Sequence, residues 1–214
     1  IFVIFIQIME IRTLINKLEK AFKDYFDEGL YFTRKGNAFV VSGTEDAVNR
    51  YSLPYEKVKV KYWFSDVWIF IKIESLQGDE KKPSQRCNIS ISFFQEAVQG
   101  QKDQLFRAEW DNYGDDSMRK HPQPHWHITS TLAVEKTIDD FKNQDNDYGA
   151  FAELLEEQKR DLLNIPAMHF AMAGPWIETG DRQLFINEED QVVCWMKNLF
   201  NHVRDEIDYL KQRK

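Results

Sequence analysis

Apolar residues recur with two different spacings in different parts of this sequence, and together these spacings restrict the chain to a mixed fold. Residues 57–94 contain KVKVKYWF and RCNISISFF, in which apolar and polar residues alternate. Alternation with period two is typical of a strand that buries one face. Residues 9–28 and 188–212 instead place apolar residues at i, i+3, i+4 and i+7, the pattern of an amphipathic helix. One chain that carries both patterns in long segments is neither all-helical nor all-strand.

The order of these segments predicts an α+β fold in a single domain of 214 residues. Strand-like segments follow one another over residues 31–131 and are joined by short polar loops, which favours an antiparallel sheet. We predict a helix at 9–28, a sheet of about six strands, and a helical layer over 134–214 that packs on one face of the sheet. Within that layer, residues 134–143, 148–163 and 188–212 have helical patterns.

Charge and cysteine content narrow the classes of function. The formal net charge is −7, so a general attraction of the whole surface to nucleic acid is not expected, and only a local basic patch would support it. Cys87 and Cys194 form no CxxC pair, which favours reduced thiols in a cytoplasmic protein. The first eight residues, IFVIFIQI, are too short to span a bilayer, so no membrane association is expected. We interpret them as a non-native extension or as a short buried strand.

Three of the five histidines lie in one stretch, WDNYGDDSMRKHPQPHWHI, at residues 110–128. On a strand, side chains at i and i+2 share a face, so His125 and His127 project together while Trp126 projects to the opposite, apolar face. The preceding strand alternates in the same way. Its polar side carries Arg107, Glu109 and Asp111. If the two strands pair, their polar faces bring a cation, carboxylates and two imidazoles together.

Three interpretations of this group remain open. In the first, the group is a metal site in which His125 and His127 bind Zn²⁺ or another divalent ion. In the second, it is a metal-independent acid–base site, in which one imidazole accepts a proton and the other donates one. In the third, it is a binding surface that catalyses no reaction. For the metal site, candidate further ligands are Glu109, Asp111, His121 and His169.

The same stretch resembles the signature of the TumE-like toxin family of bacterial toxin–antitoxin pairs. The matching elements are Asp111-Asn112, His121-Pro122 and the Pro124-His125-x-His127 group. The chain departs from the family pattern at Trp126, where the family tends to have histidine, and at Arg107, which lies further before the aspartate. The resemblance covers about 25 residues and implies a bacterial toxin-like or nuclease-like role.

The leading hypothesis is therefore a nuclease-like or toxin-like protein that acts on RNA. His125 and His127 are its acid–base pair or its metal ligands. Arg107 holds the anion, and Glu109 or Asp111 orients an imidazole. The alternative is a non-catalytic interaction module, such as an antitoxin partner or an adaptor for another protein. The sequence does not predict an oligomeric state.

Overall fold

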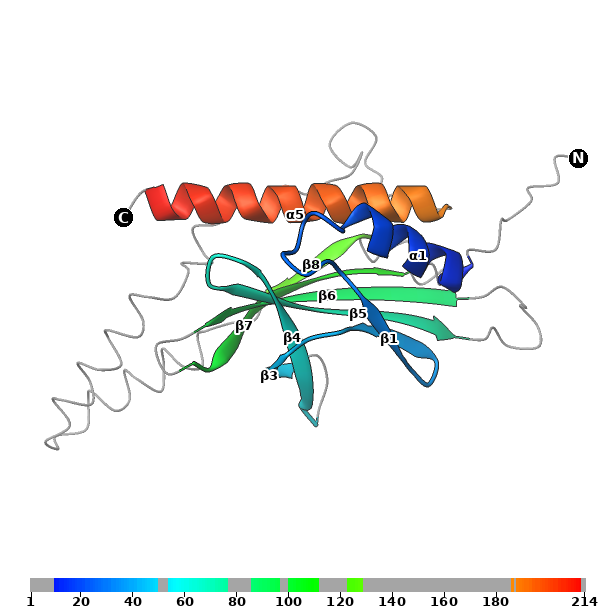
Figure 1. Ribbon diagram of the computed structural model, residues 1–214, viewed down its shortest axis with the longest axis horizontal. Helices are drawn as coiled ribbons and strands as arrows, with labels where there is room; N and C mark the ends of the chain where they lie inside the picture. The colour runs from blue at the N-terminus through cyan, green and yellow to red at the C-terminus, as the bar shows by residue number, and fades with distance from the viewer. Residues whose placement is uncertain are drawn as a thin grey trace, which may run out of the picture.

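The part of the chain that the computed structural model describes is an α+β arrangement of one antiparallel sheet and two helices, which confirms the predicted fold class (Figure 1). The structure describes residues 10–49, 54–76, 86–96, 100–111, 123–128, 186 and 188–212. Residues 1–8 and the helices predicted at 134–143 and 148–163 lie outside these ranges. The described elements are α1 (Ile11–Ala21), β1 (Phe32–Lys35), β2 (Ala38–Val41), β3 (Glu45–Asn49), β4 (Glu56–Phe64), β5 (Val67–Leu76), β6 (Arg86–Glu96), β7 (Lys102–Asp111), β8 (His125–Ile128) and α5 (Glu189–Gln212).

Among the described residues the sheet has eight strands, against about six predicted, and it divides at β5. One edge of β5 pairs with β6 along its whole length, from Val67 opposite Gln95 to Leu76 opposite Arg86. The other edge is shared, because β4 pairs with the first part of β5 and β2 with the last part. β7 and β8 then continue the sheet beyond β6. β8 is thus the last described strand on that side.

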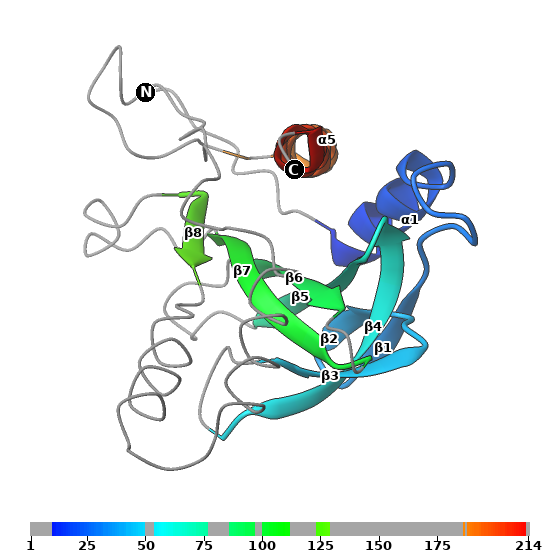
Figure 2. The same cartoon turned by 90° about the vertical axis from the view of Figure 1, so that its left-hand side faces the viewer.

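Helix α5 lies on one face of the sheet, as predicted for the C-terminal layer, and α1 lies on the same face; Figure 2 shows the two helices side by side above it. This face is the apolar one, because the inward residues of the central strands are fully or nearly fully buried: Ile69, Ile71, Ile73, Ile89, Ile91, Phe93, Phe106, Ala108 and Trp110. Helix α5 covers them with a stripe of its own: Val192, Trp195, Met196, Leu199, Phe200, Val203 and Ile207. Lys17 of α1 joins the helices by ion pairs to Glu189 and Asp190 of α5. Neither helix is both long and apolar enough to cross a membrane.

Helix α1 ends earlier than its hydrophobic pattern predicts, at Ala21 instead of residue 28. After Phe22 the backbone closes tighter turns, since the amide of Tyr25 donates to the carbonyl of Phe22 and that of Gly29 to Phe26. Gly29 has a φ of +71°, a conformation that glycine adopts without strain and that ends the turn. The apolar period continues past the helix because Phe22 and Phe26 both pack against Phe200 of α5.

The opposite face of the sheet is polar near β6 and β7. Ser90 and Ser92 of β6 lie opposite Glu109 and Arg107 of β7, and all four residues are buried. Strand β3 approaches this face, because the hydroxyl of Ser92 donates to the Asn49 side-chain oxygen over 3.4 Å. A polar face that is largely withdrawn from water is unusual for a solvated antiparallel sheet, and it is where the histidine strand is placed.

Candidate metal centre

Strand β8 pairs with β7 in a register that joins the predicted polar residues. His125 lies opposite Glu109, and His127 lies opposite Arg107. Trp126 lies opposite Ala108 on the other face, and its ring contacts that of Phe106 with a centroid separation of 5.6 Å. The predicted pairing of these two strands and the predicted division of their faces are therefore confirmed.

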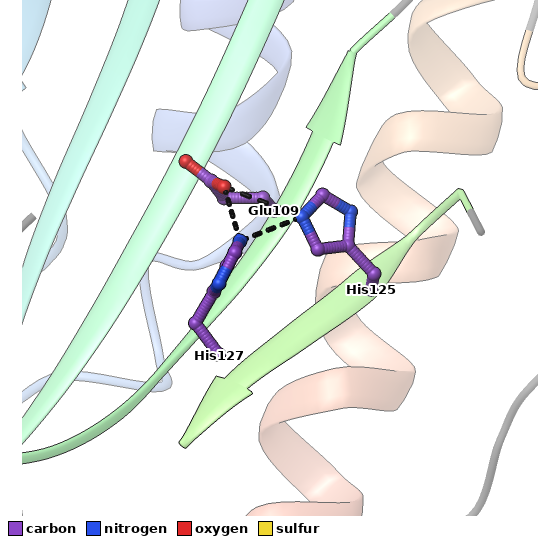
Figure 3. A group of neighbouring side chains, drawn as sticks. All are labelled: Glu109, His125 and His127. Atoms are coloured by element: carbon purple, nitrogen blue, oxygen red, sulfur yellow. Dashed lines mark hydrogen bonds and ion pairs between the residues drawn. The ribbon is translucent and has the colours of Figure 1, made fainter. Parts of the chain in front are cut away.

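The two imidazoles and one carboxylate converge on a common point (Figure 3). Oε2 of Glu109 lies 2.9 Å from Nε2 of His127 and 3.4 Å from Nε2 of His125. The two Nε2 atoms are 2.7 Å apart. All three candidate ligand atoms lie within 4.8 Å of one another, so the group could hold a metal ion.

Burial of the group is uneven, and the unevenness gives the site an open side. The side chains of Glu109 and His125 are 7% and 11% exposed, whereas that of His127 is 45% exposed. Arg107 lies beneath them with its Nη2 atom 3.3 Å from Glu109 Oε2, and its side chain is only 8% exposed. A ligand would therefore reach the site past His127.

Glu109 is ionised near neutral pH in this environment. Burial alone raises the pKa of its carboxyl group, but the contact with His125 and the positive charge of Arg107 outweigh burial and leave the pKa below its ordinary value. Oε1 of Glu109 is buried and has no hydrogen-bond partner among the described residues. The carboxylate is thus charged, withdrawn from water and only partly satisfied.

His127 is neutral over a wider range of pH than an ordinary histidine. Burial lowers the pKa of its imidazole first, and the charge of Arg107 lowers it further, while Glu109 acts in the opposite direction with a smaller effect. A neutral imidazole nitrogen is the form that binds metal or accepts a proton. Together with the ionised Glu109, His127 is in the protonation state that a divalent ion requires.

Both shifts make the folded protein less stable in acid. The pKa of His127 is lower in the folded chain than its ordinary 6.5, so the unfolded chain takes up the proton first, and stability falls as the pH drops through 6.5 toward the folded value. The lowered pKa of Glu109 contributes stability above its ordinary 4.5, and this contribution is lost as the pH falls through the folded value.

We expect the pKa of His127 to rise in Arg107→Gln, because the substitution removes the neighbouring positive charge that disfavours the imidazolium. The measurement is an NMR titration of the His127 ring proton in the metal-free protein. Lys72→Gln is the matched control, because Lys72 is a cation on β5 on the same face of the sheet as Arg107. Lys72 pairs with Glu74 at 2.8 Å. An unchanged His127 titration in Arg107→Gln, or an equal rise in the control, would contradict this assignment.

The other predicted site residues lie apart from the group or outside the described chain. Asp111 is on the same face of β7, but its carboxylate accepts a 2.6 Å hydrogen bond from Gln123, whose side-chain oxygen in turn accepts from the Asp111 amide. Asp111 therefore anchors the approach to β8, and Glu109 is the carboxylate that meets the histidines. His121 and His169 lie outside the described residues.

Cys87 is a neutral thiol, because burial raises its pKa to about 12.

Sequence reasoning missed three polar residues around the group. The sequence pattern predicts no contact between Gln123 and Asp111, and alternation in RCNISISFF gives Ser90 and Ser92 only a place on the polar side of their strand. Their places follow from the pairing of β6 with β7, which sets Ser90 opposite Glu109 and Ser92 opposite Arg107. Strand alternation gives the face of each serine, but only the register gives its neighbour.

Comparison with known proteins adds no assignment: no family model, no curated protein and no solved structure matches this chain.

Proposed function

We propose that this protein is a metal-dependent hydrolase of phosphodiester bonds, with RNA as its substrate class and with a divalent ion held by His125, His127 and Glu109. The observation that carries the proposal is the convergence of three ligand atoms from two paired strands within 4.8 Å. Two imidazoles and a carboxylate suit Zn²⁺, and the same set also accepts other transition-metal ions.

The exposure of the group favours a catalytic ion over a structural one. Structural zinc sites are closed by four protein ligands, whereas catalytic sites keep a position for water or substrate. Here three ligands are present among the described residues, and the exposed ring of His127 leaves one side accessible. A divalent ion held by these residues would lower the pKa of its water toward neutrality and so supply the hydrolytic nucleophile.

The chain's own residues favour an anionic substrate. Arg107 places a guanidinium next to the ligand group, where it can bind a phosphate oxygen and stabilise charge that develops during cleavage. Because the net charge of the chain is −7, attraction to a polyanion must be local, and Arg107 with the bound ion provides such a local positive centre. The resemblance of residues 110–128 to TumE-like toxins is consistent with this role, and a bacterial toxin is the biological setting we propose for it.

A second candidate is metal-free acid–base cleavage of RNA. It is favoured by the direct 2.7 Å contact between the Nε2 atoms of His125 and His127, since such a contact needs one protonated and one unprotonated nitrogen. In that mechanism one ring accepts the proton of the attacking hydroxyl group and the other protonates the leaving oxygen. The two candidates use the same residues and differ in whether a chelator abolishes activity.

The test is cleavage of a labelled RNA by chelator-treated protein, with and without Zn²⁺ or Mn²⁺. We expect cleavage only after metal is restored, and a loss of at least about 100-fold in His125→Ala, since a group that acts in proton transfer or holds the ion contributes on that order. His202→Ala, a histidine on α5, is the matched control and should cleave like the wild type. Full activity in chelator would favour the acid–base candidate.

Failure of the wild type to cleave RNA under any of these conditions would contradict the proposed hydrolase. The non-catalytic interaction module would then be the better account of the histidine group. Equal cleavage by wild type and His125→Ala would show that the activity comes from a contaminant or from another part of the chain.

A further inference from the structure

One carboxylate oxygen in the site lies close to three nitrogen atoms. Oε2 of Glu109 faces Nη2 of Arg107 at 3.3 Å, as well as the Nε2 atoms of His125 and His127 at 3.4 and 2.9 Å. Only the contact with His127 has a good hydrogen-bond length, and the other two are long. The second oxygen, Oε1, has no hydrogen-bond partner among the described residues. The Arg107–Glu109 pair is thus a single long contact rather than the bidentate pair that guanidinium and carboxylate form when they are arranged for each other.

Counted over the described residues alone, the charges of the site balance in the absence of a metal ion. Arg107 and Glu109 cancel, and the two imidazoles add nothing when neutral. A divalent ion adds two positive charges within a few ångströms of a guanidinium whose side chain is 8% exposed. Asp111 on the same strand offsets one of them at most, and Lys72 and Glu74 on β5 cancel each other through their own ion pair. Uncompensated charge in a buried site is costly, so an anion beside the ion and Arg107 would stabilise the loaded site.

We infer that binding of the metal ion and binding of a phosphate-type oxyanion are coupled at this site through Glu109. Glu109 would hold the ion through Oε2, and Arg107 would then donate to an oxygen of the anion in place of its long contact with Glu109. The inference rests on the proposed metal site and specifies its regulation: the protein binds anionic substrate well only after it has bound metal. Arg107 is the residue that converts metal loading into substrate affinity.

Linkage makes this coupling measurable from either ligand. If the anion raises the metal affinity by some factor, the metal raises the anion affinity by the same factor, and couplings of this kind are typically about 5–150-fold. We expect the dissociation constant for Co²⁺ to fall by about tenfold in saturating anion, which is within that range. The metal-free protein should bind the anion correspondingly weakly.

The experiment is a titration of the full chain with Co²⁺, followed by calorimetry and by visible absorption, in buffer alone, in inorganic phosphate and in dimethyl phosphate. Association of Co²⁺ with each anion is measured separately and subtracted. The two probes separate a dianionic monoester-like ligand from a monoanionic diester-like one. Since the proposed substrate is a phosphodiester, we expect coupling with dimethyl phosphate as well as with phosphate.

Arg107→Gln should bind Co²⁺ at least as tightly as the wild type, because a positive charge is removed. In this variant the anion should change the dissociation constant for Co²⁺ by less than about twofold. Arg107→Lys, which keeps the charge without the planar fork, should retain part of it and serves if the glutamine variant does not fold. Lys72→Gln removes a cation from β5 and should keep the full coupling.

The outcomes separate this inference from the proposed function. Tight Co²⁺ binding that neither anion changes would overturn the coupling and leave the metal site in place. Undiminished coupling in Arg107→Gln would also overturn it, because the anion would then be held by the ion alone. No Co²⁺ binding at all would overturn the proposed metal site and the coupling together.

Discussion

Glu109→Gln lowers the affinity of the protein for a divalent ion by at least about 100-fold, if the ion lies where the two imidazoles meet. Loss of a residue that only orients a ligand already costs about 10–100-fold. Glu109 supplies a ligand atom itself, and it is the only carboxylate in the described group. Glutamine keeps the shape and one carbonyl oxygen, so the substitution isolates the contribution of the negative charge. The measurement is a competition titration against a chromophoric chelator.

The experiment must distinguish a loss of metal binding in Glu109→Gln from a loss of folding. Arg107 and Glu109 are both buried, and removal of one charge of a buried pair can destabilise a protein by about 3–5 kcal/mol. Urea unfolding of each variant without metal therefore accompanies the titration. Glu74→Gln is the matched control, because Glu74 is a partly buried carboxylate on the same face that pairs with Lys72 instead of the histidines. Wild-type metal affinity in Glu109→Gln, in a folded sample, would contradict the metal site.

The faces of the site strands could be predicted from the sequence, but their register could not. Alternation with period two places His125, His127, Glu109 and Asp111 on polar faces whatever the pairing. A shift of two residues between β7 and β8 would keep every face and set His125 opposite Asp111. The structure instead sets His125 opposite Glu109, and Asp111 bonds to Gln123. The choice between two carboxylates thus depends on a register that no local pattern encodes.

The elements that sequence reasoning missed or misplaced are those whose state depends on distant partners. Strand β3 has the sequence EDAVN, in which Val48 is exposed and Asn49 is buried, the reverse of what their polarity predicts. It is a strand because it pairs with β4, from Glu45 opposite Val60 to Asn49 opposite Glu56. Helix α5 was predicted within one residue, because a long apolar stripe and acidic first turn act within the helix itself.

The fold on which the site depends is stabilised by a cluster of aromatic rings beneath α5. The ring centroid of Phe200 lies 4.9 Å from that of Trp63, 5.4 Å from that of Phe22 and 5.6 Å from that of Phe93. Phe93 in turn stacks on Phe106 of β7 at 4.9 Å. A continuous series of ring contacts therefore runs from α5 along the apolar face of the sheet to β7, the strand that carries Arg107 and Glu109.

Phe200→Ala should lower the free energy of unfolding by about 3–5 kcal/mol, because it removes a fully buried ring and leaves a cavity that its rigid neighbours cannot fill. The loss is a large part of the stability of an ordinary domain. Urea unfolding followed by tryptophan fluorescence measures it, since Trp63 contacts the substituted ring. Tyr209→Ala on the same helix is the control; its side chain is exposed, and the expected change is within about 0.5 kcal/mol. Equal effects of the two substitutions would mean that α5 does not pack on the sheet through Phe200, and the support beneath β7 would then have to come from elsewhere.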